Sequence, residues 1–312
     1  MKLLLNFNFD DEKMNKIKEL GLDVQYIPED EMDSRDDFYD ADIWLAYSAF
    51  NSVEMEKFEN LKYIILTSTG LDMVPKDYIL ENRILLSNNK SGYSIPIAES
   101  IVMYILQVYK NSYQSMKKQE LKIWSMDMSW QEITGKKIGF LGTGRISQCA
   151  AKRLQAFDAE IWGVNTNGRD IEYFSRCFSL SDSDEFFREC DVIVGVMPET
   201  PGTEHIVDAS KIDMMKEGSV LINVGRGNLI DLEALGVFID KFRGVVLDVV
   251  EEEPLSPLSY LWDRDNVIIT PHNSWVSEKI DDRRFEYFYR NLKSYLETGK
   301  PVDIVNSLEK GY

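Results

Sequence analysis

Residues 138–147 read IGFLGTGRIS, a glycine-rich turn between an apolar run and a helix-patterned stretch. Gly142 permits the tight turn, and Gly144 lets the backbone approach a pyrophosphate, whose charge then meets the N-terminus of the helix. Ser147 stands where a third glycine usually allows close packing of helix on strand. Because a strand precedes the motif and a helix follows it, the stretch predicts a dinucleotide-binding turn. The cofactor-binding residues predicted on it are Gly142, Thr143, Gly144, Arg145 and Ile146.

Short apolar runs alternate with helix-patterned stretches along the rest of the chain. Runs such as VLINV at 220–224 and VIIT at 267–270 are nearly continuous, as expected for parallel strands covered on both faces. Their alternation with helices, for example over 11–20 and 146–157, is the βαβ pattern of doubly wound sheets. The predicted strands span 2–7, 43–47, 63–67, 84–86, 137–141, 160–164, 192–196, 220–224, 244–248 and 267–270.

The chain has 312 residues, a length that favours two domains. A long, largely apolar stretch at 96–123 precedes a fresh βαβ unit, and a charged amphipathic helix at 277–298 has no strand after it. We therefore expect an α/β fold with two doubly wound parallel sheets, in which a Rossmann dinucleotide-binding domain is inserted in a second domain. The inserted domain comprises 93–280, and the other comprises 1–92 and 281–312.

The charge balance excludes several classes of partner. Lys and Arg total 35 against 53 Asp and Glu, a formal net charge of −18. Nucleic acids and anionic membranes both attract clustered cations, so neither is an expected partner. Three cysteines without paired spacing indicate thiols in a reducing cytosol rather than disulfides or a metal site. No window reaches the roughly 18–20 apolar residues of a membrane span, so we expect a cytoplasmic protein.

The residues after the predicted strand 160–164 bear on the choice between NAD and NADP. An NAD site usually has an acidic residue there, which holds the ribose 2′-hydroxyl. In this chain the strand is followed by amide, hydroxyl and guanidinium groups, which accept a 2′-phosphate that a carboxylate would repel. The pattern favours NADP, although a polar loop with an unrelated arginine remains an alternative. The predicted cofactor-binding residues here are Asn165, Thr166, Asn167 and Arg169.

Three side chains at predicted strand ends are candidates for catalysis. His272 follows the strand VIIT, at the carboxyl end where open α/β sheets place their ligands. Arg226, between two glycines after VLINV, is placed to grip a carboxylate with its planar fork, or it is a surface arginine in a turn. Glu253 lies in the acidic run EEEP, which is either functional or a solvated charge cluster. The other histidine, His205, is predicted to be structural or exposed.

In chain order, the strings GFLGTGRIS, NVGRG, LDVVEEEP and TPHNS resemble the D-2-hydroxyacid dehydrogenase family, which is D-isomer-specific and NAD(P)-dependent. The resemblance covers essentially the whole chain and includes IAES at 97–100 and MPETPGT at 197–203. It implies that the domain 1–92 and 281–312 is a flavodoxin-like, substrate-binding and catalytic domain. It also implies that Arg226 binds the substrate carboxylate and keto oxygen. It further implies that His272 is the acid/base and that Glu253 supports this histidine.

The same resemblance implies how the rest of the site is built. The turn at Ser68, Thr69 and Gly70 resembles the one whose backbone N–H groups hold the substrate carboxylate. A carboxylate beside the histidine favours the protonated imidazole that reduction of a keto group requires. The aspartate of LDV contacts the nicotinamide carboxamide in the family. The cofactor-binding residues implied beyond the glycine turn are Met197, Pro198, Thr203, Val224, Gly225, Asp248 and His272.

The implied activity is hydride transfer between NADPH or NADH and a small 2-keto acid, as in glyoxylate/hydroxypyruvate reductases. Two alternatives are 3-phosphoglycerate oxidation and a dinucleotide-sensing interaction protein like the family's corepressors. The sequence ends at Tyr312 without the regulatory domain of many phosphoglycerate dehydrogenases, and no basic cluster for a phosphate stands out at 45–75. We expect a homodimer, because the apolar stretch 96–123 matches the family's dimerisation arm.

Overall fold

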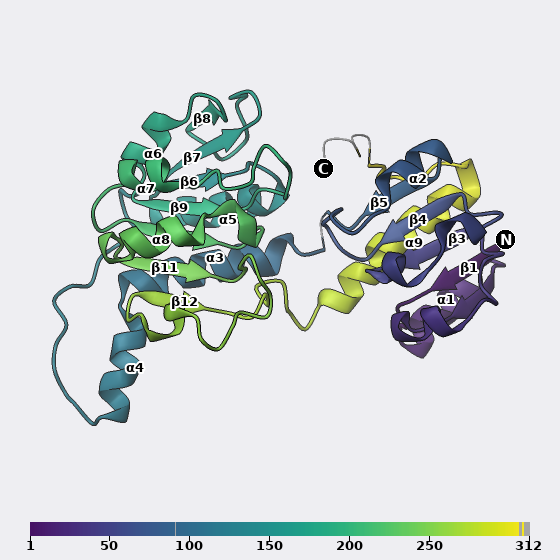
Figure 1. The fold of residues 1–312 in the computed structure, drawn as a ribbon, viewed down its shortest axis with the longest axis horizontal. Helices are drawn as coiled ribbons and strands as arrows, with labels where there is room; N and C mark the ends of the chain where they lie inside the picture. Colours follow the sequence, from purple (N-terminus) through teal and green to yellow (C-terminus); the bar gives the residue numbers. More distant parts are fainter. Residues whose placement is uncertain (91, 306–307, 309–312) are drawn as a thin grey trace. The chain divides into compact units, whose positions relative to one another are not determined.

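The chain divides into two compact units (Figure 1). In the computed structural model, which describes residues 1–90, 92–305 and 308, the first unit comprises Met1–Tyr93 with Ser277–Tyr312 and the second comprises Ser94–Val276. The boundaries predicted from the sequence, after 92 and after 280, differ from these by one and by four residues. The assignment of the substrate to the first unit and of the dinucleotide to the second stays a prediction.

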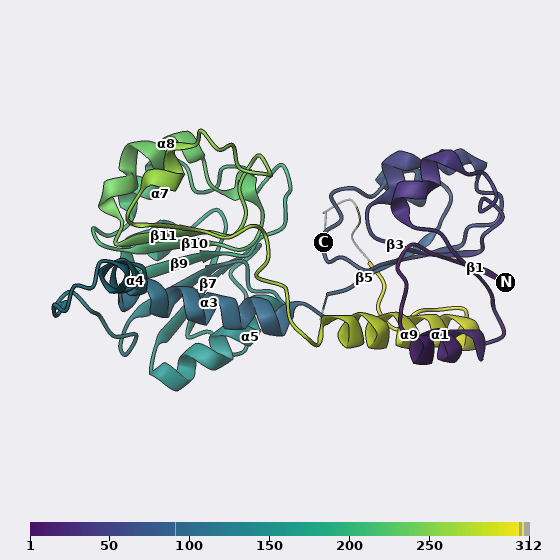
Figure 2. The ribbon, with the colours of Figure 1, turned by 90° about the horizontal axis from the view of Figure 1, so that it is seen from below.

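The first unit is a parallel five-stranded sheet with helices on both faces (Figure 2). Its strand order, β2-β1-β3-β4-β5, is the expected flavodoxin-like order. The strands are β1 (Lys2–Leu5), β2 (Asp23–Tyr26), β3 (Ile43–Ala46), β4 (Tyr63–Leu66) and β5 (Leu85–Asn88). Helices α1 (Asp11–Lys18) and α9 (Ile280–Thr298) cover one face. The other face carries α2 (Lys76–Glu81) and the 3-10 turns Glu29–Ser34, Ala49–Ser52 and Met55–Lys57.

Strand β1 shows why the central strands are apolar throughout. Leu3 and Leu5 pack in one cluster with Ile17 of α1 and Phe288 of α9. Leu4 belongs to the cluster on the opposite face of the sheet. A strand that is covered on both faces has no solvent side for polar residues, which is why three leucines follow one another.

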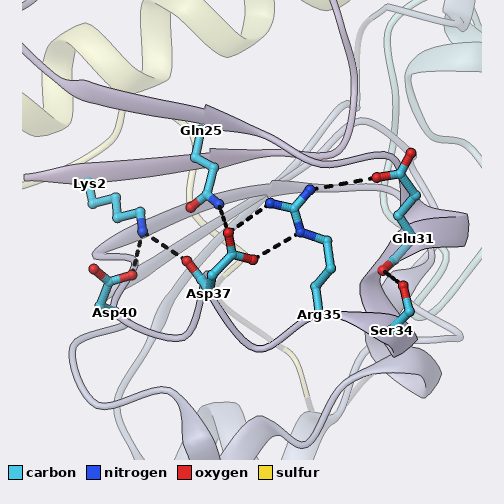
Figure 3. A network of polar contacts seen from close by, with 7 residues as sticks. All are labelled: Lys2, Gln25, Glu31, Ser34, Arg35, Asp37 and Asp40. Atoms are coloured by element: carbon cyan, nitrogen blue, oxygen red, sulfur yellow. Dashed lines mark hydrogen bonds and ion pairs between the residues drawn. The ribbon is translucent and has the colours of Figure 1, made fainter.

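A polar network connects β1 and β2 with the segment 35–40 that precedes β3 (Figure 3). Asp37 accepts hydrogen bonds from Nε and Nη2 of Arg35 at 2.9 and 2.7 Å, and from Gln25 of β2 at 3.2 Å. Lys2 of β1 contacts Asp40 at 2.5 Å. The Arg35 guanidinium holds the pKa of Asp37 below its usual range. Because Arg35, Asp37 and Asp40 border water, which screens their charges, the ion pairs contribute little to the free energy of unfolding.

The second unit is a parallel seven-stranded sheet, with α3 and α5 on one face and α7 and α8 on the other (Figure 2). Its order, β12-β11-β10-β9-β6-β7-β8, reverses between β6 and β9, which is the expected Rossmann arrangement. The strands are β6 (Lys137–Leu141), β7 (Glu160–Asn165), β8 (Arg176–Ser179), β9 (Val192–Gly195), β10 (Val220–Asn223), β11 (Gly244–Leu247) and β12 (Val267–Ile269). The helices are α3 (Ser94–Tyr109), α4 (Ser112–Glu120), α5 (Arg145–Leu154), α6 (Asp184–Glu189), α7 (Ala209–Met214) and α8 (Leu232–Phe238).

The structure adds two strands to those that the sequence predicts. β2 (DVQY) and β8 (RCFS) are short edge strands with partly exposed side chains, so neither has the apolar run on which the prediction depends. The apolar stretch 96–123 forms two helices, with Asn111 in a left-handed conformation (φ 48°) between them. Buried residues such as Ile101 and Ile105 place α3 in the core of its unit, whereas α4 has no buried residue.

Candidate active site

The glycine turn between β6 and α5 leaves room for a pyrophosphate. Gly142 has φ 98°, which side chains disfavour, and a Cβ there would approach the carbonyl oxygen of Val196 to 3.2 Å. A Cβ on Gly144 would meet no atom within 4 Å, so a ligand can approach this backbone closely. The buried Ser147 hydroxyl donates to the Gly142 carbonyl at 2.6 Å. Ser147, which stands in place of the third glycine, therefore stabilises the conformation of the turn through this hydrogen bond.

The first turn of α5 supplies hydrogen-bond donors at this place. Gly144 is the N-cap, so the N–H groups of Arg145, Ile146 and Ser147 have no intrahelical acceptor. None of the three finds another backbone acceptor within residues 1–90, 92–305 and 308. These donors and the positive end of the helix dipole fit a dinucleotide's pyrophosphate. Thr143 is buried, with its methyl group over Gly163 of β7.

Predicted cofactor residues from three strand ends come together at one edge of the sheet. A Cβ on Gly225 would lie 2.9 Å from the carbonyl oxygen of Met197, whose side chain also reaches Gly142. Thr203 donates to the Pro198 carbonyl at 2.7 Å and so closes the loop after β9. This edge lies at the reversal of strand order, where doubly wound sheets bind their ligands.

Asn165, where an NAD site usually has an acid, closes the loop after β7. Its side-chain oxygen accepts from the backbone N–H groups of Asn167 and Arg169 at 3.3 and 3.1 Å, and its amide donates to the Arg169 carbonyl at 2.9 Å. The Arg169 guanidinium is exposed and donates to the side chain of Asn167 at 3.2 Å. Asn165 therefore shapes the loop, while the exposed groups that could meet a 2′-phosphate are those of Thr166, Asn167 and Arg169.

Arg226 lies on a loop that Asn223 fixes. Asn223, the last residue of β10, accepts from the Gly225 N–H at 3.1 Å and donates to the Arg226 carbonyl at 2.8 Å. The Arg226 guanidinium donates to the Gly225 carbonyl at 2.8 Å, and Val224 is buried. Sequence reasoning missed Asn223, although a polar residue at the end of an apolar strand is a signal for such a role.

His272 and Glu253 are brought together, with Nδ1 of the histidine 2.8 Å from Oε2 of the carboxylate. The side chains of His272 and Glu253 are 45% and 39% exposed, so the pair borders solvent. Glu253 also accepts from the Val250 N–H at 3.3 Å, which orients the carboxylate. His272 has φ 49°, a left-handed conformation uncommon outside glycine. Such strain tends to occur at functional positions, where the surrounding structure maintains it.

Asp248 anchors the loop that carries the histidine. It is 2% exposed, and its Oδ1 accepts from the Thr270 hydroxyl at 2.7 Å and from the N–H groups of Asn273 and Ser274 at 3.1 and 3.2 Å. Tyr104 of α3 bonds the Thr270 hydroxyl at 2.9 Å, and burial raises the pKa of this tyrosine, which keeps it neutral. The contact of Asp248 with the nicotinamide stays a prediction.

The predicted substrate turn follows β4 in the first unit. Thr69 donates from its hydroxyl to the Asn89 carbonyl at 2.8 Å, and Asn88 donates to the Thr69 carbonyl at 2.5 Å. The residues after β5 therefore hold the turn. In the described part of the chain, the backbone N–H groups of Ser68, Thr69 and Gly70 find no backbone acceptor. Consecutive N–H groups of this kind suit a carboxylate.

The chain is similar to known proteins both in sequence and in structure. The family model of the NAD-binding domain of D-isomer-specific 2-hydroxyacid dehydrogenases matches residues 102–274. A glyoxylate reductase of Thermofilum pendens is 30% identical over 277 residues, 86% of this chain and 81% of that protein. A D-3-phosphoglycerate dehydrogenase of Methanocaldococcus jannaschii is 30% identical over 275 residues, 86% of this chain and 52% of that protein. A solved structure of an acyclic imino acid reductase with NADPH and D-Arg is 26% identical, with a TM-score of 0.86, and the match covers 98% of this chain and 100% of that one.

Because the matched model describes an NAD-binding domain and includes the turn between β6 and α5, the protein is an NAD(P)-dependent oxidoreductase. It belongs to the D-isomer-specific 2-hydroxyacid dehydrogenase family. This confirms the resemblance in the sequence motifs and the expected fold class. No helix among the described residues is long and apolar enough to cross a membrane.

Proposed function

We propose that the protein reduces a small 2-keto acid to the D-2-hydroxy acid, in the manner of a glyoxylate/hydroxypyruvate reductase. The observation that carries this proposal is the 2.8 Å contact between His272 and Glu253. A histidine whose Nδ1 faces a carboxylate has its Nε2 available to donate a proton to a carbonyl oxygen. Arg226, on the loop after β10, supplies the planar guanidinium that binds the carboxylate of a 2-keto acid through two hydrogen bonds.

Different groups carry out the steps of this mechanism. When bound, the nicotinamide cofactor supplies the hydride. Reduction leaves negative charge on the keto oxygen, and Arg226 stabilises that charge while it fixes the substrate carboxylate. His272 gives this oxygen a proton from Nε2, and Glu253 stabilises the imidazolium before the transfer. That the backbone N–H groups of Ser68, Thr69 and Gly70 also bind the carboxylate stays a prediction from the family resemblance.

NADP is the preferred cofactor in this proposal. Support comes from the loop after β7, which offers Thr166, Asn167 and Arg169 and has no carboxylate between 165 and 169. The structure of the similar imino acid reductase contains NADPH. Because Asn165 donates to the loop through its amide, an aspartate there would disturb the loop as well as its charge. Arg169→Ala is the cleaner test, since it removes one exposed guanidinium and keeps the backbone bonds.

A cytoplasmic homodimer is the remaining part of the proposal. Beyond α4 the chain exposes apolar side chains: Trp124 is wholly exposed, and Met126 and Met128 are each 88% exposed. An apolar patch of this kind is typical of an interaction surface. A second copy of the chain is the partner that the family's dimerisation arm implies. The described cysteines are free thiols, which suits a reducing compartment.

A screen for oxidation of NADPH and NADH tests the function. The substrates are glyoxylate, hydroxypyruvate, pyruvate, phenylpyruvate and branched 2-keto acids, with 3-phosphohydroxypyruvate for the alternative activity. We expect turnover of at least one small 2-keto acid, a D-configured product, and nearly complete loss of turnover in His272→Ala. Cofactor binding without turnover of any keto acid would instead favour the dinucleotide-sensing alternative.

A further inference from the structure

His205 lies where two loops of the second unit meet, and it contacts both of them. Its backbone N–H donates to the Asn228 carbonyl at 2.7 Å. Its ring Nε2 lies 2.6 Å from Oε1 of Glu251. One residue therefore joins the loop after β10 to the loop after β11.

Each partner of His205 lies two positions from a proposed catalytic residue. Asn228 follows Arg226 by two residues, and Glu251 precedes Glu253 by two residues. A histidine outside the proposed catalytic set is thus connected to the loops that carry Arg226 and Glu253.

The two loops also touch through their backbones. A Cβ on Gly227 would lie 2.0 Å from the carbonyl carbon and oxygen of Val250. The Val250 N–H donates to Glu253 at 3.3 Å, and Glu253 contacts His272 at 2.8 Å. Any displacement of the loop after β11 is therefore transmitted to the carboxylate that faces the acid/base histidine.

The acidic run EEE in this loop explains why a contact that fixes the position of the loop is useful. Adjacent carboxylates repel one another, and the two histidines of the chain pair with alternate ones: His205 with Glu251, and His272 with Glu253. Glu252 lies exposed between them. The side chains of His205 and Glu251 keep 44% and 37% of their exposure, so water screens the pair and limits its contribution to overall stability. Its effect is on the placement of the loop.

We propose that His205 and Glu251 are positioning residues, which hold the loop after β11 so that Glu253 faces His272. The inference rests on the proposed function, since the placement matters to the rate only if that pair transfers a proton. Truncation of the His205 side chain leaves its backbone N–H, and hence its bond to the Arg226 loop, in place. The loss therefore falls on kcat rather than on KM for the keto acid.

Matched variants test this by steady-state kinetics. Glu251→Ala and Glu252→Ala remove the same charge from the same run. We expect Glu251→Ala to lower kcat roughly tenfold with KM unchanged, and Glu252→Ala to change neither. His205→Ala should match Glu251→Ala. The variant His205→Gln keeps a side-chain N–H donor at this position, where φ is 48°, so it should recover most of the loss. The double variant should lose no more than either single one, because the two side chains act as a pair.

Equal kcat in Glu251→Ala and Glu252→Ala would overturn the positioning role, and so would the absence of recovery in His205→Gln. In both cases the proposed function would still stand if the unmodified protein reduced a keto acid and the His272→Ala variant did not. A general loss of stability, with kcat, KM and Tm changing together in Glu251→Ala, would also refute it. Absence of keto acid turnover by the unmodified protein would remove the proposed function and this inference together.

Discussion

Gly227→Ala should slow the enzyme severely while the protein still folds. The new Cβ would lie 2.0 Å from the carbonyl carbon and oxygen of Val250 and 2.4 Å from the backbone nitrogen of Glu251. These are backbone atoms, which cannot rotate away as the end of a side chain can. To reach the 3.4 Å at which ordinary contact begins, the two loops must separate by about 1.4 Å, the difference between 3.4 and 2.0 Å.

That separation exceeds what the hydrogen bonds of the site tolerate. The contact of His272 with Glu253 is 2.8 Å long, and a hydrogen bond is lost beyond about 3.5 Å. A misplacement of about 1 Å costs roughly 100-fold in rate, so we expect kcat to fall roughly 100-fold. This fall corresponds to about 2.7 kcal/mol of activation free energy. Overpacking should also lower the free energy of unfolding by about 1–3 kcal/mol.

The assay is NADPH oxidation with the best keto acid from the screen, with thermal unfolding measured in parallel. Gly202→Ala is the matched control, because the nearest atom to a Cβ there is Thr200 Oγ1 at 4.0 Å. It should leave both kcat and Tm unchanged. If Gly227→Ala turned over as fast as Gly202→Ala, contact between the loops would have no part in placing Glu253, and the reasoning would be refuted.

Four further predictions concern catalysis, substrate, cofactor and assembly. His272→Ala should lower kcat by roughly 10²–10⁴ and leave the dissociation constant of the cofactor nearly unchanged; a substantial loss of cofactor affinity would show that cofactor binding, rather than proton transfer, is its main role. Arg226→Ala should chiefly raise KM for the keto acid, since alanine cannot donate hydrogen bonds to the substrate carboxylate. An unchanged KM would count against carboxylate binding by Arg226. Arg169→Ala should lower kcat/KM for NADPH relative to NADH, and an unmodified protein that prefers NADH would show the NADP assignment to be wrong. Light scattering at micromolar concentration should give about twice the 36.1 kDa of one chain, and a mass near the single-chain value would rule out the dimer.

The central strands were predictable because burial on both faces leaves them no polar positions. β10 and β11 read VLIN and GVVL, and their sequence limits follow almost directly from where the apolar run stops. β2 and β8 could not be found in this way, because their sequences, DVQY and RCFS, contain no apolar run. The glycine turn was predictable because it needs a positive φ at Gly142 and open space at Gly144.

The site was predictable in its residue types but not in its connections. The strand-end rule and the family motifs select Arg226 and His272, since each lies three residues beyond the end of an apolar strand, β10 and β12. No local pattern indicates that His205 contacts Glu251, 46 residues away, because that contact depends on how two loops pack. Nor does the sequence show that the side chain of Asn165 is engaged in closing its own loop.

The two ends of the second unit lie beside each other, because the Ser100 hydroxyl near the start of α3 donates to the Ser274 carbonyl at 3.1 Å. A segment whose ends meet can be excised or transplanted as a cassette, since a short linker spans the gap in its host. The polypeptide 94–276 is therefore a natural module for exchange between hosts. Recombination at its two ends would join the unit that carries the glycine turn to a different first unit, and the cluster that packs around β9, β10 and β11 would be transferred whole.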